Sequence, residues 1–391
     1  MSDIYASNGI GLYVHWPFCE AKCPYCDFNS HVRSQISQRR WLKAYLSEID
    51  RLAYQMPKRV LNTVFFGGGT PSLMDPDIVG SIIEHAKGKW TTADNIEVTL
   101  EANPGSVEAG RFSAYASDGV NRISLGIQAL RDADLRRLGR IHSVEDSFLA
   151  IGMAKKFFGR INLDFIYARQ NQSTEEWRRE LGEIVSIGTD HLSLYQLTIE
   201  PGTPFWKRHQ IGKLENLPND DQGATMFDVT RELCDSAGYS AYEISNHAMP
   251  ESECRHNLVY WRYLDYIGIG PGAHGRITLD GNRYGTESHS MPEKWLRQVE
   301  AGSGYSRVDK LSSSEQACEY LLMTMRTASG ADLEKYAGLS GERISLNTLK
   351  NLRELDLIDI KGNRVFATRK GQLLLNSVIL ELLKKNNGAA M

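Results

Sequence analysis

Short β-rich runs alternate with amphipathic helical segments through the first two thirds of this 391-residue chain. Strands separated by helices of about ten or more residues are typical of a parallel sheet with right-handed crossovers. About six such units in order favour an α/β barrel, complete or partial, over a dinucleotide-binding fold. In such a barrel the functional residues lie at the carboxyl ends of the strands. The runs begin at Gly11, Asn62, Asn95, Asn121, Arg160, Asp190 and Tyr239, and the main helices between them are expected over Gln38–Tyr54, Pro76–Lys87, Val107–Ser117, Thr174–Ser186 and Asp220–Ser236.

The pattern changes near residue 245. Residues 245–283 are rich in Gly, His and aromatic residues, and we expect a loop there with one short strand that starts at Asp265. Helices follow one another from about Met291, and a short two-stranded piece then precedes a last helix from Lys370. The order of helices and strands is that of a winged helix. We therefore expect a barrel over 1–245, a connecting segment over 246–290 and a helical, winged-helix-like domain over 291–391.

Charge and cysteine content exclude several classes of protein. The 45 basic and 48 acidic residues leave a net charge of −3, which provides no general field for nucleic acid. A DNA-recognition surface made of Lys350, Arg353 and Arg364 is therefore less favoured than a packing module. No apolar run approaches the ~20 residues that span a bilayer, and the N-terminus lacks the pattern of an export signal. Three of the six cysteines fall within eight positions, which favours a metal or cluster site in the reducing cytoplasm.

Those three cysteines form a C-x3-C-x2-C motif, CEAKCPYC, at Cys19, Cys23 and Cys26. Thiolates are soft ligands for zinc and for iron–sulfur clusters. Three thiolates cannot complete a structural zinc site, whereas a cubane held by three cysteines keeps one iron open to a small molecule. The alternatives are a zinc site completed by His15 or His31, or three unrelated buried thiols.

The segment from Tyr13 to Cys26, YVHWPFC-x3-C-x2-C, resembles the radical S-adenosylmethionine (radical SAM) superfamily. Within that superfamily it is similar to the branch of oxygen-independent coproporphyrinogen III oxidases and HemW-type heme chaperones. The resemblance implies a partial (β/α)6 TIM-like barrel with a [4Fe-4S] cluster bound by Cys19, Cys23 and Cys26. It also implies that the amine and carboxylate of SAM bind the open iron.

Further motifs follow the predicted strands. Three glycines in FFGGGTPS would let the backbone approach a bound group, although the glycine run by itself favours a plain turn. Glu101 could accept from hydroxyls or an amine, and Arg140 could bind a carboxylate, but each could also be an ordinary surface charge. The resemblance implies that Tyr13, Gly68 and Glu101 contact the SAM on the cluster. It places Tyr25, Gly69, Thr70, Gln128, Arg140 and Asp164 at a second SAM site.

Two features separate the chaperones from the oxidases. The oxidases carry a further cysteine two positions after the triplet and a longer N-terminal arm, whereas this chain has Phe28 at that position and 18 residues before Cys19. The segment that starts at Cys254, CRHNLVYW, resembles the HNxxYW motif of the HemW group. Imidazole is a good axial ligand for heme iron, and aromatic faces suit a macrocycle, so His256 is our candidate heme ligand. Cys254 and His274 are weaker candidates, and the alternative is that the motif belongs to the protein core.

The resemblance therefore implies a heme chaperone. Such a protein would bind heme and pass it to an acceptor hemoprotein, such as a respiratory enzyme or a heme storage protein, with no nucleic-acid partner. The alternative function is coproporphyrinogen III oxidation, in which a radical formed from SAM starts the decarboxylation of propionate groups.

Overall fold

The computed structural model describes residues 8–33, 35–106 and 109–384. A 12-stranded sheet within these residues has the order β14-β13-β12-β11-β1-β4-β5-β6-β7-β8-β10-β9. The stretch from β1 to β8 is parallel throughout, which confirms the predicted partial (β/α)6 barrel. Its strands are β1 (Gly9–Trp16), β4 (Val60–Gly68), β5 (Thr91–Ala102), β6 (Arg122–Gln128), β7 (Arg160–Tyr167) and β8 (His191–Gln196).

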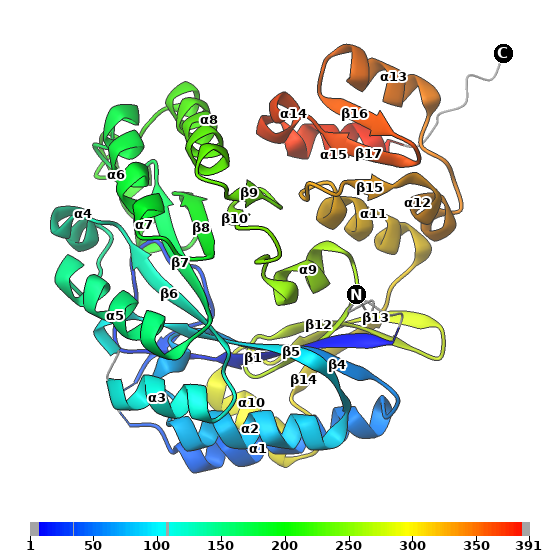
Figure 1. Ribbon diagram of the computed structural model, residues 1–391. Helices are drawn as coiled ribbons and strands as arrows, with labels where there is room; N and C mark the ends of the chain where they lie inside the picture. Colours follow the sequence, from blue (N-terminus) through cyan, green and yellow to red (C-terminus); the bar gives the residue numbers. More distant parts are fainter. Residues whose placement is uncertain (1–7, 34, 107–108, 385–391) are drawn as a thin grey trace.

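Helices cover the outer face of the parallel strands (Figure 1). Three of them begin at capping boxes that the sequence encodes locally, at Ser143, Ser173 and Asn219. The expected start of one helix at Val107 lies outside the described residues, where α3 is described from Ala109. The helices are α1 (Gln38–Gln55), α2 (Pro76–Lys89), α3 (Ala109–Ser117), α4 (Asp132–Arg137), α5 (Val144–Phe157), α6 (Thr174–Ser186), α7 (Pro204–Gln210) and α8 (Asp220–Ser236).

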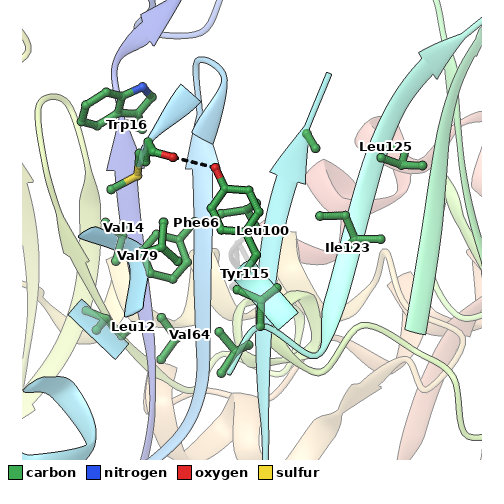
Figure 2. Close-up of a cluster of buried hydrophobic side chains, with 14 of the residues drawn as sticks. Leu12, Val14, Trp16, Val64, Phe66, Val79, Leu100, Tyr115, Ile123 and Leu125 are labelled. Carbon is green, nitrogen blue, oxygen red and sulfur yellow. Dashed lines mark hydrogen bonds between the residues drawn. The ribbon is translucent and has the colours of Figure 1, made fainter. Parts of the chain in front are cut away.

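Side chains point alternately to the two faces of each strand, and this alternation separates an apolar outer layer from a polar interior. Figure 2 shows Val14, Phe66 and Leu100 of neighbouring strands packed with Val79 of α2 and Tyr115 of α3, and all five side chains are fully buried. The intervening residues of each strand face the inside of the barrel. On β5 to β8 these inward residues are mainly polar, and they lead up to the cavity described below. They are Glu97, Thr99, Glu101, Arg122, Ser124, Asn162, Asp164, His191, Ser193 and Tyr195.

The run that begins at Tyr239 does not form the expected parallel strand. Only β9 (Ser240–Ala241) is extended, and β10 (Asn246–Ala248) returns antiparallel to β8. The Glu243 carboxylate accepts from the backbone N–H of Ser245 at 2.9 Å and from the side-chain amide of Asn246 at 2.5 Å. These bonds close a turn in the middle of the run, so the strand cannot continue.

Residues 245–283 contain more regular structure than the loop we expected. They form the helix α9 (Arg255–Trp261), the strand β11 (Asp265–Ile269), which pairs in parallel with β1, and a hairpin that extends the sheet with β14. Figure 1 shows α9 on the inner side of the sheet, opposite α1 and α2. The remaining strands are β2 (Phe18–Cys19), β3 (His31–Val32), β12 (His274–Leu279), β13 (Asn282–Ser288) and β14 (Tyr305–Lys310).

The C-terminal part has its own core and the expected winged-helix-like order. A three-stranded sheet packs against helices over buried side chains that include Leu321, Val365 and Val378. None of the helices in the described ranges is both long and apolar enough to cross a membrane. The elements are α11 (Ser313–Thr324), β15 (Ala331–Asp332), α12 (Leu333–Ser340), α13 (Leu346–Glu354), β16 (Ile358–Lys361), β17 (Arg364–Ala367), α14 (Arg369–Leu373) and α15 (Leu375–Leu383). This core begins after the expected boundary at residue 291, because α10 (Pro292–Glu300) packs on α1, with Trp295 stacked on Trp41 at 5.5 Å, and belongs to the core of the barrel.

Candidate cofactor site at the strand ends

A cavity of about 420 Å³ opens at the carboxyl ends of the parallel strands. Of the 13 site residues predicted from the sequence, the structure brings 11 together in its wall, and Tyr13 and His256 lie outside it. This position is the one expected for a functional site in a parallel barrel. The 11 residues are Cys19, Cys23, Tyr25, Cys26, Gly68, Gly69, Thr70, Glu101, Gln128, Arg140 and Asp164.

Cys19 ends β2, and Cys23 and Cys26 lie in the loop that follows it. The backbone N–H of Cys26 donates to the carbonyl of Cys23 at 3.2 Å, and Pro24 between them accepts from the N–H of Phe205 at 2.9 Å. Burial raises the pKa of the Cys19 and Cys26 thiols above the usual value. The loop is therefore held in place by its own turn and by α7, and it presents neutral thiols that metal binding would deprotonate.

The donor set fits a cluster better than a single zinc ion. No three His, Cys, Asp or Glu side chains in the described part of the chain converge where one ion could be held. The imidazole of His15 bonds through Nδ1 to the Tyr13 hydroxyl and through Nε2 to the Asn29 carbonyl, and His31 bonds to the Asn29 side chain. Both proposed fourth zinc ligands are thus engaged elsewhere. A cubane binds each of its thiolates at a different iron, so it does not need them to converge.

Glycines bring the β4 backbone to the cavity wall. Gly68 has a φ of 113°, and a Cβ atom there would lie 2.6 Å from the ring of His15. A Cβ on Gly69 would lie 2.5 Å from the carbonyl oxygen of Phe18. Both positions therefore require glycine, because no side chain fits there. This requirement is the same for a functional approach of the backbone and for a plain turn.

Glu101 ends β5 beside these glycines. Its Oε2 atom accepts from the backbone N–H of Gly68 at 3.2 Å. Burial, with Asp164 nearby, raises the pKa of Glu101 from 4.5 to about 8. The group can therefore exchange a proton near neutral pH or accept from a cationic or hydroxyl-bearing ligand.

Arg140 reaches into the cavity from the loop after α4. Its Nη1 atom lies 3.5 Å from Sγ of Cys23, and its Nη2 atom donates to the carbonyl of Gly126 at 3.0 Å and to the side chain of Asn103. The guanidinium is thus held beside the cysteine loop, where it could face an anionic ligand group. It is not the isolated surface charge that the sequence left open.

Two further predicted residues line the cavity, Asp164 within β7 and Gln128 at the end of β6. Asp164 on β7 accepts from Ser124 at 3.0 Å and from Asn162 at 2.8 Å. Gln128 at the end of β6 has a φ of 70°, an uncommon conformation for a residue with a side chain. The turn after β6 therefore holds its backbone in an unusual direction at the edge of the cavity.

Tyr13 and His256 form a layer beneath the cavity. The ring of Tyr13 stacks on Phe65 and on His256, with centroid distances of 6.2 and 6.4 Å. His256 is 1% exposed, and its Nδ1 and Nε2 atoms lie 2.7 Å from Thr63 Oγ1 and 2.5 Å from the Tyr260 hydroxyl. In this conformation neither ring nitrogen is free to bind iron.

The two weaker heme-ligand candidates differ in exposure. Cys254 is fully buried and donates to Glu97 at 3.6 Å, and burial raises the pKa of its thiol to about 12. In this conformation the thiol is therefore neutral and enclosed in the core. His274 is exposed at the start of β12.

The cavity also contains residues that we did not single out from the sequence. Asn103, Ser124 and Tyr195 line it. Asn103 follows the last residue of β5 and Tyr195 precedes the last residue of β8, whereas Ser124 is the third residue of β6. The strand-end rule could have found Tyr195, which is the fifth residue of β8. Its side chain belongs to the wall that carries Asp164.

Known proteins resemble this chain over most of its length. The model of the radical SAM superfamily matches residues 13–184. The heme chaperone HemW of Haemophilus influenzae is 35% identical over 95% of this chain and 97% of its own, and HemW of Escherichia coli is 39% identical over 77% and 80%. The mouse protein called radical S-adenosyl methionine domain-containing protein 1, mitochondrial, is 35% identical over 97% and 88%. The structure of the coproporphyrinogen III oxidase HemN from Escherichia coli, a radical SAM enzyme, superposes with a TM-score of 0.81 at 20% identity, over 97% of this chain and 92% of HemN.

Proposed function

The chain belongs to the HemW family of heme chaperones within the radical SAM superfamily, and from this membership we propose that it binds heme and transfers it to an acceptor hemoprotein. HemW of Haemophilus influenzae aligns with 95% of the chain, including the segment that contains His256. The likeness to HemN, at 20% identity, concerns the fold alone.

The cavity supports the cofactor part of this proposal. Cys19, Cys23 and Cys26 would hold a [4Fe-4S] cluster, which when loaded supplies one-electron chemistry at its open iron. The single observation that carries the proposal is that these thiols, Glu101 and Arg140 face one cavity. Thiols suit iron, the carboxylate suits an amine or ribose hydroxyls, and the guanidinium suits a carboxylate. That combination of groups matches the functional groups of SAM.

The chain's own residues orient such a ligand and keep it in place. Gly68 and Gly69 line the cavity at the end of β4, where glycine is required by the close packing of His15 and Phe18, and Tyr13 supports the cavity floor from below. Tyr25, Thr70, Gln128 and Asp164 surround the remaining volume, where a second SAM molecule would bind.

Heme binding by His256 requires α9 to move. Its Nε2 atom is bonded to Tyr260 and its ring is sealed against Phe65, whose centroid lies 5.0 Å away. We propose that α9 leaves the inner side of the sheet when heme binds, so that His256 becomes an axial ligand. Tyr260 and Trp261 would then offer aromatic faces to the macrocycle.

One anaerobic experiment tests this function. The protein, reconstituted with iron and sulfide, is incubated separately with heme and with coproporphyrinogen III, each with SAM and a reductant. We expect a stable heme complex that loses its heme to an apo-hemoprotein, and unchanged coproporphyrinogen. Formation of protoporphyrinogen would instead establish the oxidase function and overturn the chaperone proposal.

A further inference from the structure

A chain of buried hydrogen bonds ends at the carboxylate of Asp164 in the cavity wall. The side-chain amide of Asn162 donates to Asp164 Oδ1 and to Ser124 Oγ, both at 2.8 Å, and Ser124 donates to Asp164 Oδ2 at 3.0 Å. His191 Nδ1 lies 2.5 Å from Asn162 Oδ1, and His191 Nε2 lies 2.9 Å from the hydroxyl of Tyr242. Both carboxylate oxygens are therefore held from inside the barrel.

The chemistry of these groups fixes the direction of every bond. Asp164 accepts, so the Nδ2 atom of Asn162 must face it and the Oδ1 atom must face His191. His191 Nδ1 then carries the proton, and Nε2 of the neutral ring accepts from Tyr242. Burial and the nearby Arg122 lower the pKa of His191 well below 6.5, in agreement with a neutral ring. Each donor consequently points toward the cavity.

The end of this hydrogen-bond chain that lies away from the cavity, at Tyr242, reaches the segment that carries α9. Tyr242 is 8% exposed and packs in one buried cluster with Cys254, the N-cap residue of α9, and Leu258 on α9. Asn162 and His191 are 2% and 0% exposed, so water does not replace them as partners. A continuous path of side chains thus joins α9 to the cavity wall.

Asp164 needs this support because its surroundings oppose a negative charge. Burial raises the pKa of Asp164, while its bonds to Asn162, Ser124 and Ser193 lower it. The titratable and charged groups that face it from the neighbouring strands are Glu101 on β5, Arg122 on β6 and Tyr195 on β8. Loss of the donors would leave desolvation and Glu101 to favour the protonated form.

We propose that Asn162 and His191 are positioning residues, which hold Asp164 as an oriented, ionised carboxylate for a cationic or hydroxyl-bearing part of the cavity ligand. This inference rests on the proposed function, because SAM is the ligand with which it is tested. If this chain of hydrogen bonds were only structural, its disruption would lower the free energy of unfolding without changing ligand affinity through Asp164.

The experiment measures SAM affinity by equilibrium dialysis on anaerobically reconstituted protein with equal iron content. We expect His191→Phe to weaken binding at the Asp164 site about tenfold, the equivalent of one charge-assisted hydrogen bond. His191→Gln, which can still donate to Asn162 and accept from Tyr242, should restore most of the affinity. His247→Phe is the matched control, because His247 lies on the adjacent β10 and is 1% exposed but takes no part in the chain.

A double-mutant cycle shows whether His191 acts through Asp164. His191→Phe should have no further effect in an Asp164→Asn background. The loss caused by Asn162→Leu should also shrink from about pH 6 to about pH 8, as the less supported carboxylate ionises. Because Asp164 influences the pKa of Glu101, both proteins carry Glu101→Gln in this comparison, so that only Asp164 differs in its titration.

Three results would overturn the inference. They are wild-type affinity in His191→Phe, an undiminished effect in the Asp164→Asn background, and a pH-independent loss in Asn162→Leu. If His191→Phe does not fold, Tyr242→Phe tests the same chain by removing one hydroxyl, and unchanged affinity there counts against it. Wild-type protein that binds no SAM would contradict the proposed function itself, whereas wild-type binding with unaffected variants would contradict only this inference.

Discussion

The Nε2 atom of His256 lies 2.5 Å from the hydroxyl oxygen of Tyr260, four residues along the same helix. Thr63 engages the other ring nitrogen at 2.7 Å. If His256 binds heme iron as proposed, the iron and Tyr260 therefore compete for its Nε2 atom. The heme-ligand role of His256 depends on how easily that bond opens.

Removal of the Tyr260 hydroxyl should favour heme binding. Tyr260→Phe keeps the aromatic ring but releases Nε2, so we expect heme affinity to rise about five- to tenfold, the value of one hydrogen bond. His256→Ala should abolish the axial-ligand signature in the heme spectrum. Tyr266→Phe is the control, because Tyr266 packs on Tyr260 at 4.5 Å without a bond to His256. Equal heme affinities of Tyr260→Phe and the wild type would contradict the proposal that His256 is the heme ligand.

The cysteine triplet should account for all bound cluster iron. Replacement of Cys19, Cys23 and Cys26 by Ala should reduce reconstituted iron from about four atoms per chain to nearly none and abolish the iron–sulfur absorbance. Cys318→Ala serves as the control, since this half-buried cysteine lies on α11 outside the cavity. A triple variant that retained the full absorbance would contradict the proposed ligation.

The stability of the metal-free protein should depend on Glu101. Its folded-state pKa of about 8 exceeds the unfolded value of 4.5, so the folded protein holds a proton that the unfolded chain has lost between these values. Stability from this group is therefore present below about pH 4.5 and is lost as pH rises through about 8. Glu101→Gln should gain about 1–3 kcal/mol over wild type between about pH 5 and pH 8, measured by urea unfolding. If the free energies of unfolding of the two proteins changed with pH in parallel, the Glu101 carboxyl would have the same pKa in the folded and unfolded states.

Strand periodicity predicted the edge of the sheet at which the cavity opens. Because the carboxyl ends of parallel strands meet at one edge, Glu101, Gln128 and Asp164 were predicted to meet despite their separation along the chain. The glycine run and Arg140 carried too little local information, and only the resemblance assigned them to the same site. Tyr195 was missed although it obeys the same strand-end rule.

Helix α9 could not be predicted from local sequence. Its N-cap residue, Cys254, makes no capping bond through its side chain. Instead, Glu97 of β5 accepts from the backbone N–H groups of Arg255 at 3.2 Å and His256 at 3.0 Å. A carboxylate more than 150 positions away thus supplies the cap, and no pattern near the helix reveals it. The burial of His256, which decides its availability to heme, has the same tertiary origin.

Asn29 should determine how firmly the cysteine loop is held. Its side-chain amide donates to the carbonyls of Pro271 at 2.9 Å and Ser290 at 2.8 Å, and its own carbonyl accepts from His15 at 2.9 Å. Asn29→Ala removes the two amide bonds, which we expect to lower the free energy of unfolding by about 1–3 kcal/mol.

Asn29→Ala should also affect the retention of cluster iron, and this effect should be larger than the effect on the free energy of unfolding. Because Asn29 follows Cys26 by three residues, loss of its anchors lets the loop open locally, and we expect a chelator to remove iron about tenfold faster than from wild type. Asn347→Ala is the control, because Asn347 is exposed on α13. Equal rates of iron loss in Asn29→Ala and Asn347→Ala would mean that the loop is held by its own turn and by α7 alone, and that its attachment to residues 271 and 290 has no part in retaining the cluster.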